Sequence, residues 1–151
     1  MIHFRNVSKA RDVNSRALVA SAKRLLAAVG EHDASLSLSL VDDAEMRDVN
    51  RLHRGKDRPT DVLSFSIDGE GAASAAANRP ERLLGDVVIS VETARRQAAG
   101  YGATLQDEIY RLLIHGLLHV LGHDHQRAGE RRIMQREERR LAGTVGLGST
   151  P

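Results

Sequence analysis

The order of the expected elements predicts an α+β or α/β layered domain and not a helical bundle, because strands come first and are mixed with helices. Residues 34–41 and 61–67 alternate apolar and polar side chains with the period of two that marks a half-buried strand. Residues 105–121 are apolar nearly all round, which is typical of a helix buried at the centre of a domain. The 151 residues are enough for one domain with its own core. We expect that domain to span residues 1–143, followed by a disordered tail over residues 144–151.

The other elements follow from capping residues and chain breaks. The expected strands are residues 1–6, 34–41, 61–67 and 84–91. The expected helices are residues 12–29, a segment capped by Asp42 or Asp43 that carries Met46, Val49 and Leu52, then residues 92–99, 105–121 and 127–142. Thr104 followed by Asp107 resembles a capping box, and the expected helix stops are Gly30, Gly100, Gly122 and Gly143. Residues 68–80, rich in Gly, Ala and Ser, predict an exposed, mobile loop.

Composition excludes several classes of function. Cysteine is absent, so a disulfide framework, a cysteine-based zinc site and a thiol nucleophile are excluded. Only two Phe and two Tyr and no Trp occur, which argues against a recognition surface built on base stacking. The first twenty residues lack an apolar core of the kind that a signal peptide needs, and no stretch approaches the length of a membrane span. We therefore expect a soluble intracellular protein.

Positive charge is clustered, although the formal net charge is only +2. An expected loop over residues 51–58 carries Arg51, Arg54, Lys56 and Arg58 against one acidic residue. An expected helix has five arginines between residues 131 and 140, against two glutamates. The simplest interpretation of this second group is a solvated helix face.

Four of the seven histidines fall within residues 115–125. Because helical residues advance about 100° each, His115 and His119 lie about 40° apart on one face of the expected helix. Two imidazoles stacked in a buried place need a partner, and one metal ion at about 2.0–2.1 Å from both neutral rings provides it. The sequence therefore predicts a metal centre on this helix.

The third ligand depends on where that helix ends. Gly122 permits a left-handed turn, after which His125 can approach the ion that His115 and His119 share. If the helix continued, His123 would be nearer. We favour His125, because a glycine at this point is a usual helix stop, and His123 stays the rival. The spacing H-x-x-x-H-x-x-G-x-x-H also matches the ligand spacing of metzincin zinc proteases, including the glycine. Three imidazoles without cysteine suit a catalytic zinc with an open position for water.

One departure from the protease motif affects the expected reaction. Gly116 stands where those proteases have the glutamate that acts as general base, which disfavours a peptidase. Zinc still lowers the pKa of bound water toward about 7, and a cation suits a phosphoryl oxygen in the transition state. Asp124 is a candidate to orient a ligand histidine, with a simple turn residue as the alternative. Glu108 lies roughly on the face of His115, and we expect it to face solvent.

Residues 115–125, His-Gly-Leu-Leu-His-Val-Leu-Gly-His-Asp-His, resemble the signature of the YbeY family of bacterial endoribonucleases, the rRNA maturation factors. Residues 54–65 are similar to a second marked segment of that family, and residues 84–90 fit a third. The resemblance covers about residues 35–143. One departure is His123, where the family commonly has tyrosine.

This resemblance implies an α+β fold with a small mixed sheet and a central buried helix that carries the metal-binding histidines. It implies one Zn2+ per chain on His115, His119 and His125, and it places the family's functional arginine on Arg54. The implied activity is metal-dependent cleavage of single-stranded RNA, in 3′-end maturation of 16S rRNA and in ribosome quality control. The implied partners are rRNA and the small ribosomal subunit, in the cytoplasm. We expect no DNA or membrane partner and a monomeric chain.

Several alternatives remain open at this point. The nucleophile is either water activated by zinc or the ribose 2′-OH. Arg54 either neutralises the scissile phosphate or has a structural role, such as a salt bridge to Asp57 or Asp61. Two rival functions are a metal-stabilised ribosome-assembly factor that cuts nothing and a hydrolase of another substrate, including peptides. With so few aromatic residues, RNA binding is expected to be electrostatic and therefore sensitive to salt.

Overall fold

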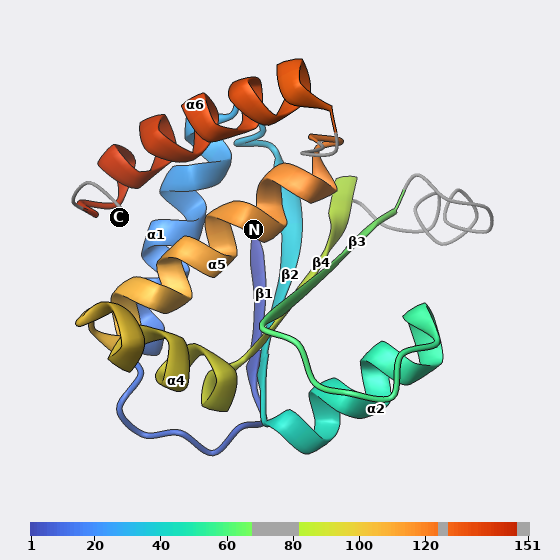
Figure 1. The fold of residues 1–151 in the computed structure, drawn as a ribbon. Coiled ribbons are helices and arrows are strands. Elements are labelled where there is room, and N and C mark those ends of the chain that lie inside the picture. The colour runs from blue at the N-terminus through green and yellow to red at the C-terminus, as the bar shows by residue number, and fades with distance from the viewer. Residues whose placement is uncertain (68–81, 124–126, 148–151) are drawn as a thin grey trace.

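A computed structural model describes residues 1–67, 82–123 and 127–147 (Figure 1). The strands are β1 (Ile2–Asn6), β2 (Ala34–Val41), β3 (Val62–Ser66) and β4 (Arg82–Ser90). The helices are α1 (Ser15–Ala28), α2 (Asp43–Arg54), α4 (Val91–Tyr101), α5 (Leu105–Val120) and α6 (Ala128–Thr144). The sheet order is β1-β2-β4-β3, with β1, β2 and β4 parallel and the edge strand β3 antiparallel to β4. The predicted α+β fold with a small mixed sheet is confirmed.

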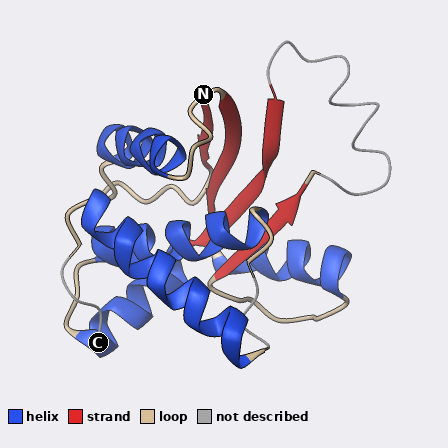
Figure 2. Ribbon diagram, turned by 90° about the horizontal axis from the view of Figure 1, so that it is seen from above, coloured by secondary structure: helices blue, strands red, loops and turns tan. Residues whose placement is uncertain are grey.

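Helices flank the strands, as Figure 2 shows from above. The main core joins α1, α4, α5 and α6 to one face of the sheet, where Leu36, Leu38 and Leu40 of β2 are fully buried. A smaller cluster packs α2 against the other face through Met46 and Leu63. The predicted alternation in β2 is confirmed, but Ser35 is also buried, because both faces of this interior strand are covered.

Helix α5 is the centre of the domain. The Asp107 N–H donates to the Thr104 side chain at 3.1 Å, so the predicted cap at the start of this helix is present. Ten of its sixteen residues are buried, among them Ile109, Leu113 and Leu117. It packs on β3 and β4 and between α4 and α6, and it crosses in front of the strands in Figure 1. The prediction of a buried central helix is confirmed.

Several boundaries differ from those predicted. Helix α2 continues to Arg54 and stops at Gly55, which has a φ of 69°, so Arg51 and Arg54 lie on a helix and not in the expected loop. Left-handed Gly102 and Gly146 follow the ends of α4 and α6, in place of Gly100 and Gly143.

The fold also continues beyond the predicted boundary at residue 143. The Leu147 N–H donates to the Ala142 carbonyl at 2.9 Å, and Val145 and Leu147 pack against the core. Residues 148–151 of the expected tail and the expected loop over residues 68–80 lie outside the described residues. In the part of the chain that is described, no helix has the length and apolar character needed to cross a bilayer.

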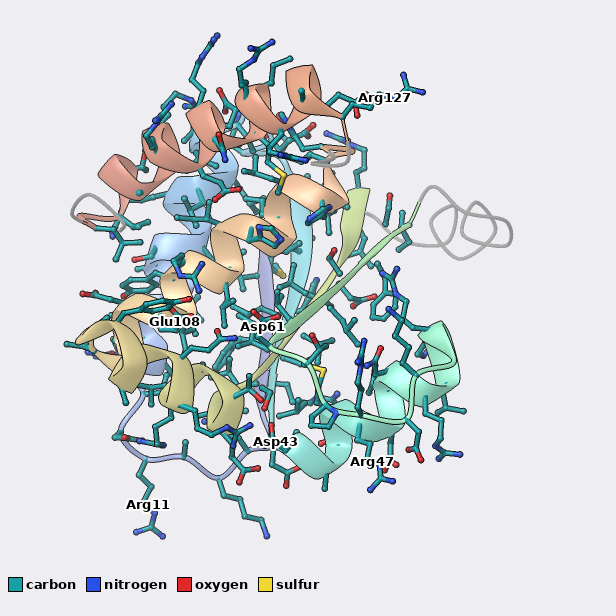
Figure 3. The ribbon with its side chains drawn as sticks, viewed as in Figure 1. Arg11, Asp43, Arg47, Asp61, Glu108 and Arg127 are labelled. Atoms are coloured by element: carbon teal, nitrogen blue, oxygen red, sulfur yellow. The ribbon has the colours of Figure 1, made fainter. Side chains whose placement is uncertain are left out.

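The start of α2 is clamped to the junction of β4 and α4 by Asp43, labelled in Figure 3. Its carboxylate accepts hydrogen bonds from Ser90 Oγ (2.6 Å), Thr93 Oγ1 (2.7 Å) and Arg96 Nη2 (2.8 Å). Burial raises the pKa of Asp43, but these three donors outweigh burial, and the pKa lies below its ordinary value. The clamp sets the direction of the helix that ends at Arg54.

We predict that Asp43→Asn lowers the free energy of unfolding by about 1–2 kcal/mol at neutral pH. Because the folded pKa is lowered, the stabilisation is complete above the unfolded pKa of about 3.9 and is lost as the pH falls through the folded value. Urea unfolding of the wild type and the variant at pH 7 and near pH 2.5 measures this difference. Asp48→Asn, an exposed position on the same helix, is the control. A stability difference that stays constant down to the acid end would contradict the clamp.

Candidate active site

His115 and His119 face each other on α5, as their spacing predicts. Their Nε2 atoms are 3.1 Å apart, and the ring centroids are 4.6 Å apart with an interplanar angle of 70°. Both side chains are half-buried, and so is Arg111 one turn earlier. The residues that separate these three along the helix are buried. The helix therefore buries its other faces in the core and leaves the stripe with the histidines within reach of solvent.

Gly116 explains how α5 lies so close to the sheet. A Cβ atom at this position would be 2.8 Å from Val87 Cγ1 and 3.2 Å from Val62 Cγ2, which is closer than ordinary packing allows. A side chain at residue 116 would thus be directed at β4 and β3. This is the physical reason why a glutamate of the protease kind has no place here.

The end of α5 follows the predicted left-handed turn. Gly122 has a φ of 94°, the Gly122 N–H donates to the His119 carbonyl at 3.0 Å, and the His123 N–H donates to the Leu118 carbonyl at 2.9 Å. The helix therefore stops, so the condition under which His123 would be the nearer ligand is not met. His125 and Asp124 lie outside the described residues.

The histidine pair meets the requirement for a shared metal ion. Two nitrogens 3.1 Å apart can both lie about 2.0–2.1 Å from one ion, and they would subtend about 100° there, near the tetrahedral angle. Imidazole nitrogens without thiolates are a donor set that zinc accepts. Within residues 1–67, 82–123 and 127–147, no group of three His, Asp or Glu side chains is placed to hold a metal ion.

Glu138 of α6 contacts this site, although its place in a run of charged residues gave no sign of it. Its Oε1 atom lies 3.6 Å from His115 Nδ1, with both side chains about one-third exposed. His115 lowers the pKa of Glu138 most; burial opposes this, and the charge of Arg111 adds to it. No local spacing signals this contact, because it arises only where α6 packs on α5.

The expectation that Glu108 faces solvent is wrong. Its side chain is 2% exposed, and Arg111 Nε donates to Glu108 Oε1 at 2.8 Å while Arg111 Nη2 contacts the second oxygen. This contact raises the pKa of Arg111, and the guanidinium also lies over the Tyr101 ring, 5.4 Å from its centroid. Glu108 can be buried because both carboxylate oxygens are paired where α5 meets α4, in the region labelled in Figure 3.

Arg54 is held at the edge of the sheet. Its Nη2 donates to the Ser64 carbonyl at 3.1 Å, and its guanidinium carbon lies 5.6 Å from the centre of the Phe65 ring. Asp57, one of the partners considered for it, instead makes a two-pronged contact with Arg47 at 2.8 and 3.0 Å. Asp61, the other, accepts hydrogen bonds from the Val62 N–H and the Gln97 side chain.

Strands β3 and β4 connect Arg54 to the histidine helix. Ser64, which accepts the Arg54 hydrogen bond, pairs with Val87. Val87 in turn lies directly under Gly116. The structure thus anchors Arg54 and the helix that carries His115 on neighbouring strands.

Comparisons with known proteins show the family of this chain. A family model described as Endoribonuclease YbeY matches residues 3–146. Endoribonuclease YbeY of Pelotomaculum thermopropionicum is 47% identical over 132 residues, which cover 86% of this chain and 85% of the relative. That of Desulfitobacterium hafniense is 42% identical over 127 residues, covering 83% and 81%. The solution structure of TM1509 from Thermotoga maritima matches with a TM-score of 0.65, over 96% of this chain and 89% of the TM1509 chain. The two sequences are 24% identical, so this likeness supports the fold alone.

The family model and the curated relatives define the class of the protein as an endoribonuclease, a hydrolase that acts on RNA. The chain belongs to the endoribonuclease YbeY family, as the three sequence segments predicted.

We predict that Gly116→Ala lowers the free energy of unfolding by about 1–3 kcal/mol, because the added methyl group overpacks the contact with Val87. Gly100→Ala in α4 is the matched control, since a Cβ there meets no atom within 4 Å, and helix propensity favours alanine. Urea unfolding of both variants tests this. Equal stability of Gly116→Ala and the wild type would show that α5 does not depend on the close approach.

Proposed function

We propose that this protein is a zinc-dependent endoribonuclease, specific for single strands, that matures the 3′ end of 16S rRNA and acts in ribosome quality control. The observation that carries the proposal is the pair of Nε2 atoms 3.1 Å apart, on the half-buried face of α5, in a chain of the endoribonuclease YbeY family. In this proposal the protein acts as a monomer in the cytoplasm, on rRNA of the small ribosomal subunit.

His115, His119 and His125 hold one Zn2+ per chain in this proposal. The tight turn at Gly122 supports His125 as the third ligand, because it redirects the chain immediately after the helix. Three protein ligands leave a position open for water or substrate. When bound, the ion supplies a Lewis acid and lowers the pKa of water toward about 7.

Arg54 binds the scissile phosphate in this mechanism. The Ser64 carbonyl occupies one of its N–H groups and the Phe65 ring one of its faces, so the guanidinium is oriented before substrate arrives. A planar guanidinium forms two parallel hydrogen bonds to a phosphate and neutralises charge that develops on it. Two other charged side chains lie near the histidines, and each already has a partner. Arg111 pairs with Glu108, and Glu138 contacts His115.

RNA binding is mainly electrostatic in this proposal. Lys56 and Arg58 follow Arg54 and are exposed, and the nearby Asp57 is neutralised by Arg47. Contacts of this kind with the phosphate backbone recognise RNA without base stacking, which accords with the scarcity of aromatic side chains. No specific observation favours peptide hydrolysis, since residue 116 is directed at the sheet.

The first prediction for this function is that the wild type cleaves a short single-stranded RNA and that His119→Ala is slower by about 100-fold or more. The variant removes one of the three proposed ligands of the ion. His32→Ala, at an exposed position between α1 and β2, is purified in the same way as a control and keeps the wild-type rate. Equal cleavage by His119→Ala would rule out a catalytic metal site. Rescue of ribosome assembly by a cleavage-dead His119→Ala would instead favour the factor that cuts nothing.

The second prediction is that Arg54→Lys keeps most of the RNA affinity but lowers the single-turnover rate by about 10- to 100-fold. Lysine preserves the charge and loses the planar fork that binds the phosphate and stacks on Phe65. Fluorescence anisotropy with labelled RNA measures affinity, and cleavage at saturating protein measures the rate. Arg51→Lys, on the same turn of α2, serves as the control. An unchanged rate in Arg54→Lys would remove Arg54 from the mechanism.

A further inference from the structure

We propose that Glu138 is a positioning residue whose carboxylate holds His115 as the Nδ1–H tautomer, so that Nε2 presents its lone pair toward His119. The consequence for metal binding rests on the proposed function. The orientation of the His115 ring does not, because it concerns the metal-free protein.

The imidazole of His115 is approached at both of its nitrogens. Glu138 Oε1 lies 3.6 Å from Nδ1, and His119 Nε2 lies 3.1 Å from Nε2. A neutral imidazole carries one N–H and one lone pair, and an ionised carboxylate can only accept. The arrangement in which Nδ1 carries the hydrogen is therefore favoured, and it leaves the lone pair on Nε2.

The packing of α6 delivers this carboxylate from a rigid element. Met134 lies one turn before Glu138 and Leu141 nearly one turn after it, and they are 1% and 0% exposed in the same core as α5. These buried neighbours fix the face of α6 that meets His115. A carboxylate on a packed helix limits the rotation of the ring more strongly than one on a loop would.

Glu138 does not approach the point that the two Nε2 atoms share, because it meets His115 at the opposite nitrogen. It therefore acts through His115 and not as a ligand of its own. The neighbouring Glu137 contacts Arg140 at 2.6 Å and so differs in its partner while sharing the same helix. The chain thus offers a matched pair of glutamates, one that contacts His115 and one that does not.

The first test is the tautomer of His115 in metal-free protein, read from long-range 1H–15N NMR correlations at a pH where the rings are neutral. The wild type and Glu137→Ala are expected to show the Nδ1–H form. Glu138→Ala is expected to gain a clear fraction of the Nε2–H form. Glu138→Gln keeps the shape of the side chain and one acceptor, so its fraction of the Nε2–H form is expected to change less. This variant shows whether the change of tautomer in Glu138→Ala comes from misfolding.

The second test is zinc affinity, measured by competition with a chromophoric chelator. Removal of a carboxylate that orients a ligand histidine typically weakens binding about 10–100-fold, and we expect this for Glu138→Ala but not for Glu137→Ala. The proposal is overturned if Glu138→Ala keeps both the wild-type tautomer and the wild-type affinity. Failure of the proposed metal site looks different: wild type and His119→Ala then bind zinc equally weakly, and the tautomer alone decides the role of Glu138.

Discussion

The close contact between α5 and the sheet at Gly116 is the constraint on which the other parts of the site depend. With no side chain at this residue, the helix lies directly over Val87 and Val62. Between Glu108 and Val120, the same approach buries α5 in the core except for the stripe of Arg111, His115 and His119, which is partly exposed. Two imidazoles on such a stripe are oriented before any ligand arrives, since the helix backbone is fixed by packing.

The neighbouring elements then place further side chains around this stripe. Helix α6 places Glu138 against the far nitrogen of His115, and the edge strand β3 holds Arg54 through the Ser64 carbonyl and the Phe65 ring. Helix α4 covers the first turns of α5, where the paired charges of Glu108 and Arg111 are sheltered. The candidate site therefore combines α5, which carries the histidine pair, with α6, which carries Glu138, and with α2, whose Arg54 is held by β3.

Local patterns predicted the parts of this arrangement that depend on local geometry. The spacing of His115 and His119 placed them on one face, Gly122 predicted the turn after them, and the alternation around Leu38 predicted a strand. Contacts made by tertiary packing could not be found in this way. Glu138 was indistinguishable from a solvated glutamate, and Glu108 is buried because Arg111 neutralises it.

Anomalous diffraction at the zinc edge, on crystals grown with stoichiometric Zn2+, tests the central claim most directly. The account predicts one strong peak about 2.0–2.1 Å from Nε2 of both His115 and His119, with His125 as the third protein ligand. Absence of a peak between these two nitrogens, while zinc is bound elsewhere on the molecule, would contradict it.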